Sequence, residues 1–169
     1  MKNIILTGMM GSGKSTCAHL LSQRLGRPME DTDDFICRLE GRSVAEIFAA
    51  EGEPHFRQKE LEAARTLGMC SGCIVATGGG MVLQREAMDA LKQNGVVIFL
   101  DRPAEQIFDG ESLEGRPLAQ GGKADFLARF RVREPLYRGT ADLTITDFSS
   151  PEATVASILD GLHRLGETS

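Results

Sequence analysis

An octapeptide near the start of the chain has the residue types and spacing of a phosphate-binding loop. Residues 8–15, GMMGSGKS, fit the pattern G-x-x-x-x-G-K-[ST]. In such a loop, backbone N–H groups point at phosphate oxygens, the Lys reaches the β- and γ-phosphates, and the hydroxyl ligates Mg²⁺. The alternative, an ordinary Gly-rich turn, is disfavoured by the full motif between a predicted strand and helix. We therefore expect a nucleoside triphosphate site formed by Gly11, Ser12, Gly13, Lys14, Ser15 and Thr16.

A second polar stretch, EDTDDF at residues 30–35, places four carboxylates within six positions. Two of them, Asp31 and Asp33, are spaced two apart. The residues alone leave three interpretations open: a solvated turn, a metal site, or the place where an acceptor substrate is chosen. Phosphate binding by itself needs neither carboxylate, so the pair favours a hydroxyl acceptor beside the nucleotide.

Three arginines lie in contexts that favour anion binding, although a solvated position is the alternative for each. Arg116 lies in a Gly-rich segment without apolar periodicity, residues 110–122, which is typical of a lid. Arg57 comes early in a predicted helix. Arg133 precedes Pro135, which should end or kink its helix. A guanidinium can grip a planar carboxylate with two parallel hydrogen bonds.

The elements expected around these motifs alternate between strands and helices. Apolar runs predict strands at residues 3–7, 73–77, 96–100 and 143–145, and a short strand ending near Glu30. Start and stop signals predict helices at residues 14–25, 35–40, 84–93, 103–108 and 123–137, and after Ser43, Pro54 and Ser150. This alternation indicates a parallel sheet covered by helices on both faces.

Length and composition narrow the function classes. The chain has 169 residues, of which 41% are hydrophobic and 25% charged, and this suits one compact domain. A formal net charge of -5 gives no support for bulk electrostatic binding of nucleic acid or anionic membrane. The longest strictly apolar run, residues 96–100, is too short to span a bilayer, and MKNIILTG is too short for a signal-peptide core. We therefore expect a cytoplasmic protein.

Two of the four cysteines form the sequence CSGC at residues 70–73. A lone CxxC can be half of a zinc site or a redox pair. No second pair or nearby His completes the four ligands of a closed zinc site, so reduced thiols are the favoured interpretation.

The nucleotide site alone does not define the reaction. The chain has no N-K-x-D sequence, which argues against a GTP switch. A motor would show an apolar strand ending in a metal-binding Asp. Asp101, at the end of VVIFLD, is a candidate, but a charged strand end is the favoured interpretation, and the chain is short for a motor. A small-molecule kinase fits the length and requires an acceptor site, a lid and cations on the transferred phosphoryl group.

Six motifs in order, LTGMMGSGKST, EDTDDF, GEPHFRQKE, ATGGG, GRPLA and RVREPLYRGTAD, resemble shikimate kinase over nearly the whole chain. The resemblance implies an α/β P-loop NTPase fold of three layers, with a five-stranded parallel sheet and helices on both faces. It implies one kinase domain, with a substrate-binding subdomain at about 32–60 and a lid at about 110–122. The implied activity is ATP- and Mg²⁺-dependent phosphorylation of the 3-hydroxyl of shikimate. We expect a monomer without nucleic-acid or membrane partners.

The resemblance also implies the roles of the catalytic residues. Lys14 and Ser15 would contact the phosphates and Mg²⁺, and Asp31 would reach the metal. Asp33 would hydrogen-bond the shikimate hydroxyls and orient or deprotonate the attacking one. Arg116 would be the lid arginine, which meets the charge that develops in transfer.

The acceptor site follows in the same way. Arg57 and Arg133 would hold the shikimate carboxylate. Gly79 and Gly80 would approach the ring with backbone N–H groups, where a Cβ would collide.

In one respect the chain departs from the family pattern. Many family members carry an Arg before the lid that stacks on adenine, and here Asp109 falls near that position. The loop that ends at Pro151 would then carry more of the adenine contact. Two alternatives remain: a kinase of the same build that acts on gluconate or a related acid, and a nucleotide-binding regulator that has lost catalysis.

Overall fold

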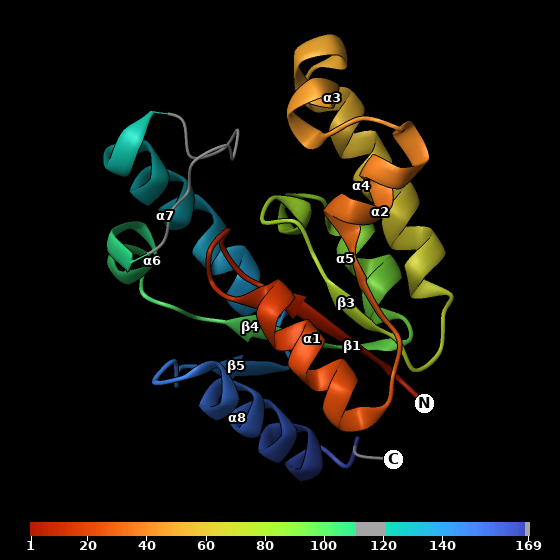
Figure 1. Ribbon diagram of the computed structural model, residues 1–169, viewed down its shortest axis with the longest axis vertical. Helices are drawn as coiled ribbons and strands as arrows, with labels where there is room; N and C mark the ends of the chain where they lie inside the picture. The colour runs from red at the N-terminus through yellow and green to blue at the C-terminus, as the bar shows by residue number, and fades with distance from the viewer. Residues whose placement is uncertain (111–120, 168–169) are drawn as a thin grey trace.

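A parallel sheet of five strands is the centre of the fold (Figure 1). The computed structural model describes residues 1–110 and 121–167. The strand order is β2-β3-β1-β4-β5, and every neighbouring pair is parallel. The predicted five-stranded parallel sheet is therefore confirmed. The strands are β1 (Asn3–Thr7), β2 (Met29–Asp31), β3 (Ile74–Ala76), β4 (Gly95–Leu100) and β5 (Leu143–Ile145).

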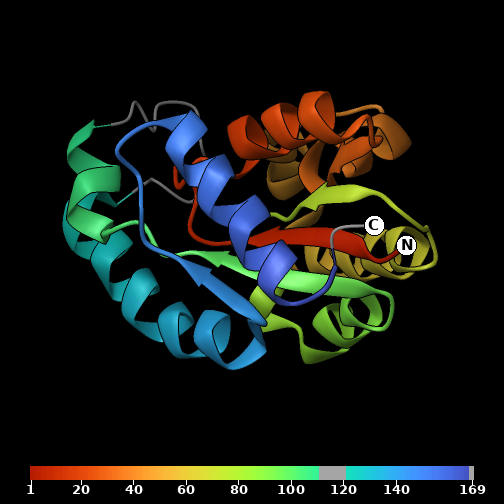
Figure 2. The same cartoon turned by 90° about the horizontal axis from the view of Figure 1, so that it is seen from below.

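Helices cover both faces of this sheet, which gives the three predicted layers (Figure 2). One face packs against α1 and α8, and the other packs against α4, α5 and α7. The helices are α1 (Lys14–Leu25), α2 (Thr32–Glu40), α3 (Val44–Glu51), α4 (Glu53–Gly68), α5 (Arg85–Lys92), α6 (Ala104–Gly110), α7 (Gly122–Thr140) and α8 (Pro151–Arg164), with a 3₁₀ turn η1 (Met81–Leu83).

The central strands bury side chains on both faces because their residues alternate between the two helical layers. In β1, Ile4 and Leu6 join the cluster formed with α1 and α8, while Ile5 joins the cluster formed with α4 and α5. All five β1 residues and all six β4 residues are buried. A strand buried on both faces reads as a continuous apolar run, so these two strands were predictable from the sequence.

The strand order brings three chemically distinct loops to one edge. The strands β2, β3 and β1 are neighbours and run parallel, so their carboxyl ends meet at the same edge. The phosphate-loop sequence follows β1, the acidic stretch follows β2, and the Gly78–Gly80 turn follows β3. Ligands of open α/β sheets bind at this edge.

The start of α2 differs from the prediction. The helix begins at Thr32 rather than Phe35, because the Asp31 side chain caps it. Asp31 Oδ1 accepts hydrogen bonds from the backbone N–H of Asp33 at 2.9 Å and of Asp34 at 3.3 Å. The predicted start was therefore wrong by three residues, and Asp33 lies in the first turn of a helix.

The sequence predicts that the helix ends or kinks at Pro135, and in the structure the helix does not end there. The helix α7 continues through Pro135 to Thr140. An interior proline costs a helix about 3 kcal/mol. Tertiary packing offsets this cost, since Phe126, Arg133 and Tyr137 of α7 are all buried.

The predicted substrate-binding subdomain corresponds to α2, α3 and the start of α4, which share a small core. Ile36, Ile47, Phe56 and Ala63 form this buried cluster. Most of the predicted lid, including Arg116, lies outside the described residues.

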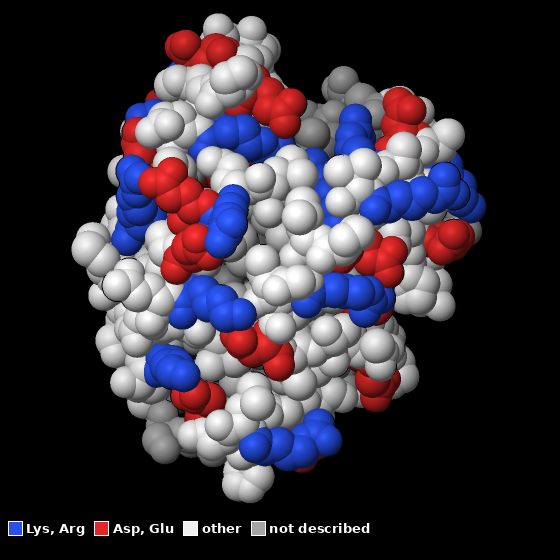
Figure 3. Space-filling model, turned by 180° about the vertical axis from the view of Figure 1, so that it is seen from behind, with Lys and Arg blue, Asp and Glu red and all other residues white. Residues whose placement is uncertain are grey.

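Two further features concern the surface of the described part. None of its helices combines the length and apolar character needed to cross a membrane. On the face shown in Figure 3, Lys and Arg are interspersed with Asp and Glu.

Candidate active site

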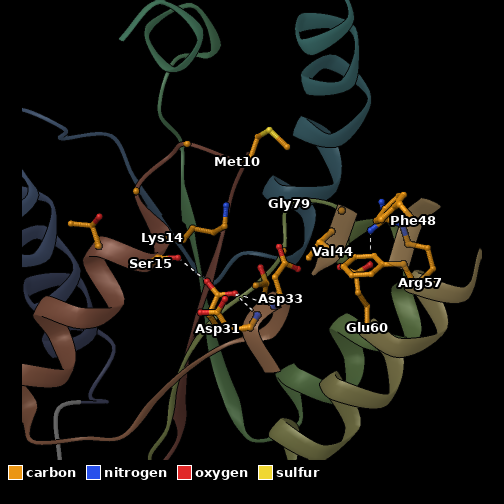
Figure 4. A pocket seen from close by; sticks show the side chains of 18 residues that line it. Met10, Lys14, Ser15, Asp31, Asp33, Val44, Phe48, Arg57, Glu60 and Gly79 are labelled. Atoms are coloured by element: carbon orange, nitrogen blue, oxygen red, sulfur yellow. Dashed lines mark hydrogen bonds and ion pairs between the residues drawn. The ribbon is translucent and has the colours of Figure 1, made fainter. Parts of the chain in front are cut away.

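A cavity of about 400 Å³ opens at the carboxyl edge of the sheet (Figure 4). Its walls come from the phosphate loop, the start of α2, the helices α3 and α4, and the turn after β3. The structure thus brings most predicted site residues to one place. Those that line the cavity are Gly11, Gly13, Lys14, Ser15, Thr16, Asp31, Asp33, Arg57, Gly79 and Gly80.

The phosphate loop has the curled backbone that its sequence predicts. Gly13 has a φ of 97°, which favours glycine, and the helix α1 begins at the next residue. The Lys14 ammonium is buried and donates to the carbonyl oxygens of Gly8 and Met9, each at 2.7 Å. The positive end of α1 and this ammonium both favour a phosphate group in the loop.

The hydroxyl of Ser15 and the carboxylate of Asp31 meet beside this loop. Ser15 Oγ donates to Asp31 Oδ2 at 2.7 Å. Both are hard oxygen donors, and Mg²⁺ uses one or two carboxylates together with phosphate and water oxygens. The pair therefore fits a Mg²⁺ ion that also binds a nucleotide. Within the described ranges, no group of three His, Cys, Asp or Glu side chains could hold a metal by itself.

Asp33 lies deeper in the cavity and its charge is disfavoured there. Its Oδ1 atom is buried and has no hydrogen-bond partner among the described residues. Burial, together with the charges of Asp31 and Glu60, raises the pKa of Asp33 to about 7, and the charge of Lys14 opposes the shift. A carboxyl with a pKa near neutrality can exchange a proton with a substrate hydroxyl.

Glu60 is a second buried carboxylate in this wall, and no role was predicted for it. A Cβ added to Gly78 would lie 2.6 Å from Asp33 Oδ1 and 3.0 Å from Glu60 Oε2. Glu60 Oε2 is also buried without a partner in the described part of the chain. Two carboxylates therefore converge on the Gly78 backbone, and only the absence of a side chain there permits it.

Arg57 is held in place by two carboxylates of its own helix. It donates to Glu60 Oε1 at 2.5 Å and to Glu53 Oε1 at 3.0 Å. Its guanidinium lies directly against the turn after β3, because a Cβ added to Gly80 would lie 2.6 Å from Arg57 Cζ. A glycine at position 80 thus leaves room for the Arg57 guanidinium. The sequence had indicated a different reason, room for the substrate ring.

Arg133 is a buried cation next to the same turn, and it does not line the cavity. It is 5% exposed, and it forms no ion pair with any acidic residue that the structure describes. Its Nη1 atom lies 3.5 Å from the position of a Cβ on Gly79. Burial lowers the pKa of Arg133, and the charge of Arg57 lowers it further. Two guanidinium groups therefore share this region, and an anionic ligand would relieve their repulsion.

Apolar side chains complete the wall next to Arg57. Val44, Phe48 and Phe56 line the cavity, and the two rings lie 4.9 Å apart. Phe56 is 4% exposed and belongs to a core cluster as well. Phe56 therefore belongs both to the wall of the cavity and to the core.

Some predicted residues lie elsewhere. Pro151 begins α8, is exposed and does not line the cavity, and Ser12 is buried within the loop. Asp101 Oδ2 accepts from Arg138 at 2.5 Å, as expected of a charged strand end. The CSGC cysteines form no disulfide in the described structure.

Fold and site together define a P-loop kinase with an acceptor cavity beside the phosphate loop. The sequence model of the shikimate kinase family matches residues 10–163. A shikimate kinase of Symbiobacterium thermophilum is 43% identical over 98% of both chains. The solved shikimate kinase from Acinetobacter baumannii, in complex with shikimate, is 34% identical, with a TM-score of 0.91 over 98% of this chain and 94% of that one. The chain belongs to the shikimate kinase family.

A gluconokinase from Sinorhizobium meliloti is similar in fold alone. It is 16% identical, with a TM-score of 0.57 over 98% of this chain and 94% of the other. The predicted gluconate alternative therefore has no support beyond the shared fold.

Proposed function

We propose that this protein transfers the γ-phosphoryl group of ATP to the 3-hydroxyl of shikimate. The observation that carries the proposal is the buried Arg133, which has no carboxylate partner in the described chain and lies close enough to Arg57, which lines the cavity, for the two charges to repel. A substrate carboxylate would neutralise this pair. The same cavity contains Asp33 for an acceptor hydroxyl and the phosphate loop for a nucleotide. Membership of the shikimate kinase family supports the same activity.

The phosphate loop would hold the donor. Lys14 would exchange its two carbonyl acceptors for phosphate oxygens, and Gly11 and Gly13 would present backbone N–H groups. Ser15 and Asp31 would hold Mg²⁺, Asp31 through water. A bound Mg²⁺ would neutralise charge on the β- and γ-phosphates during transfer.

Asp33 would orient the acceptor. Its unpartnered Oδ1 can accept a hydrogen bond from the attacking hydroxyl. With a pKa of about 7, Asp33 can also take the proton of that hydroxyl when the bond to phosphorus forms. A loose phosphoryl-transfer transition state asks little of a base, so the orientation of the hydroxyl carries most of the effect.

The two arginines would fix the other end of the acceptor. Arg57, held by Glu60 and Glu53, approaches from α4, and Arg133 approaches from α7. Holding the carboxylate would position the ring, and Gly79 and Gly80, which line the same cavity, would approach it with backbone N–H groups. Such positioning converts a bimolecular reaction into an effectively unimolecular one.

The remaining assignments belong to the same proposal. Arg116 would close over the triphosphate as part of a lid at about 110–122, and residues 32–60 would act as the substrate-binding subdomain. The loop that ends at Pro151 would contact adenine. We also propose a cytoplasmic monomer.

The direct test is turnover of Mg-ATP in the presence of shikimate, with ADP release and phosphate transfer measured together. We expect ADP release that depends on shikimate, and a phosphorylated product. Gluconate at the same concentration should give no turnover above the rate without acceptor. No shikimate-dependent release of ADP under saturating Mg-ATP would overturn the proposal.

A further inference from the structure

Tyr137 occupies a buried position between the nucleotide loop and the acceptor site. It is 1% exposed and its ring stacks on Phe99 of β4, with ring centroids 5.0 Å apart and planes at 17°. The stacking fixes the ring, and therefore fixes where the hydroxyl lies. A buried phenol hydroxyl needs partners, and those of Tyr137 belong to the site.

The Tyr137 hydroxyl joins three parts of the site. It donates a hydrogen bond to the carbonyl oxygen of Gly79, and its oxygen accepts one from the guanidinium of Arg133. It also contacts Met9 Sδ in the phosphate loop at 3.7 Å. One hydroxyl thus contacts the proposed carboxylate-binding arginine and the turn that carries the proposed backbone donors.

The hydrogen bond to Gly79 fixes the direction of the next N–H group. The peptide unit between Gly79 and Gly80 is planar and trans, so its C=O and N–H point in opposite directions. With the carbonyl held toward Tyr137 on α7, the Gly80 N–H points away from α7, and Gly80 lines the cavity. Among the described residues, the Gly80 N–H has no backbone acceptor.

We propose that the Tyr137 hydroxyl is a positioning group for the acceptor site, which sets the Gly80 N–H and the Arg133 guanidinium together. This inference rests on the proposed function, since it assumes that both groups contact shikimate. Tyr137 itself touches neither substrate. Loss of the hydroxyl lets the Gly79–Gly80 peptide rotate and removes an acceptor from a buried guanidinium, so acceptor binding weakens while the nucleotide site keeps its own contacts.

The first test is Tyr137→Phe, which removes the hydroxyl and keeps the stacked ring. We expect the KM for shikimate to rise about 10-fold, the KM for ATP to stay within about twofold, and the melting temperature to fall by a few degrees, because two buried polar groups lose a partner. The matched control is Thr140→Val on the same helix, whose hydroxyl donates to the carbonyl of Leu136 at 2.9 Å on the exposed side. It should change neither KM. An unchanged KM for shikimate in Tyr137→Phe, or an equal rise in both KM values, would overturn the proposal.

A second measurement needs no variant, because Tyr137 is the single tyrosine of the chain. Protein grown with 3-fluorotyrosine therefore carries one ¹⁹F label, on the ring that we propose senses the acceptor site. Saturating shikimate should shift this resonance. If wild-type protein turns over shikimate and the resonance does not move, Tyr137 is not coupled to acceptor binding.

The two proposals fail in different ways. Wild-type protein without shikimate-dependent turnover would remove the proposed function. The effect of the Tyr137 hydroxyl on the Gly79–Gly80 peptide can then still be tested without substrate, from the ¹⁵N–¹H resonance of Gly80. Tyr137→Phe should shift or broaden this resonance, and Thr140→Val should not. A resonance that is unchanged in Tyr137→Phe would overturn the positioning role whatever the substrate is.

Discussion

Asp33 lies where its negative charge is disfavoured. The stability lost by burying this charge is connected with its proposed role of binding the acceptor hydroxyl. Its carboxylate has an unpartnered buried oxygen, and it converges with Glu60 on the Gly78 backbone. A solvated carboxylate would destabilise the folded state less. A buried one faces its substrate without competing water, which strengthens each polar contact in the site.

The first residue-scale prediction concerns catalysis. Asp33→Asn keeps the size of the side chain and removes its ability to accept the hydroxyl proton as a carboxylate. We expect shikimate-dependent turnover to fall by at least about 10², while nucleotide binding, followed by titration calorimetry with ADP, is largely retained. Near-normal turnover would remove Asp33 from its assigned role.

The second prediction follows from the pKa of Asp33, which folding raises from 3.8 to about 7. The folded state therefore binds the proton more tightly than the unfolded state does. Ionisation of Asp33 lowers the free energy of unfolding as pH rises from about 4 to about 7, by up to about 4 kcal/mol, and costs nothing further above that range. The free energy of unfolding of Asp33→Asn has no such dependence on pH, because the amide does not ionise. This variant should therefore be more stable than wild type at pH 8, and the difference should disappear near pH 4.

Urea unfolding of both proteins at several pH values between 4 and 8 measures this difference. Asp89→Asn, on the exposed surface of α5, is the matched control, and its difference from wild type should not follow the same curve. A difference between Asp33→Asn and wild type that stays constant across the range would contradict the prediction.

At the scale of elements, the turn after β3 is the part on which several groups depend. Thr32 at the start of α2 accepts the Gly78 N–H at 2.8 Å, and Arg57 of α4 lies against Gly80. Elements that are far apart in sequence therefore meet on three consecutive glycines. Side chains of α2 and α4 are therefore positioned by contact with this turn.

The prediction at this scale is that Gly80→Ala displaces Arg57. Gly80 has a φ of -93°, which alanine adopts freely, so the effect comes from the added methyl group alone. We expect the KM for shikimate to rise about 10-fold or more and the KM for ATP to change little. Steady-state kinetics with each substrate varied in turn will measure both.

Gly139→Ala is the matched control for this change. A Cβ at Gly139 would meet nothing within 4 Å, and the residue lies in α7, where alanine favours the helix. Both KM values should be unchanged. Equal kinetics for Gly80→Ala and wild type would show that Arg57 does not need the space at Gly80 to bind substrate.

Features of the fold that are set by neighbouring residues could be predicted from the sequence, and features that depend on contacts between distant residues could not. The phosphate loop, the buried strands and the helix starts after Ser43 and Ser150 are encoded by neighbouring residues, and the structure confirms them. The start of α2 was misplaced although Asp31 is a typical N-cap residue, because its carboxylate had been assigned only to the metal.

The missed residues depend on contacts between distant parts of the chain. Glu60 follows Arg57 by three positions in a charged helix, a pattern that also describes a solvated face. Only the fold buries it against Gly78. Tyr137 reads as a core aromatic, and its partner Gly79 is 58 residues away.

In the molecule as a whole, the proposed donor and acceptor sites share one edge of one sheet. Each ligand should therefore stabilise the same cooperative unit. A ligand at 100 times its Kd adds about 2.7 kcal/mol to the free energy of unfolding. For a domain of this size, that corresponds to a rise of several degrees in melting temperature.

The prediction at this scale is a thermal shift with either ligand alone. Mg-ATP and shikimate should each raise the melting temperature, and gluconate at the shikimate concentration should not. A regulator that has lost the acceptor site would respond to ATP only. That outcome, in protein whose native circular dichroism is intact, would favour the regulator.

The crowding of Arg57 against Gly80 also restricts how this cavity can evolve toward another acceptor. While Arg57 keeps its place, a side chain at position 80 would collide with its guanidinium, so a change of Gly80 alone displaces Arg57 and weakens the acceptor site. Replacing Arg57 first opens the space, but it leaves the buried Glu60 without its main counterion. Each single change therefore disturbs a neighbour, so a lineage that abandons a carboxylate-bearing substrate has to change Arg57, Glu60 and Gly80 as a set. This mutational epistasis favours retention of the ancestral specificity.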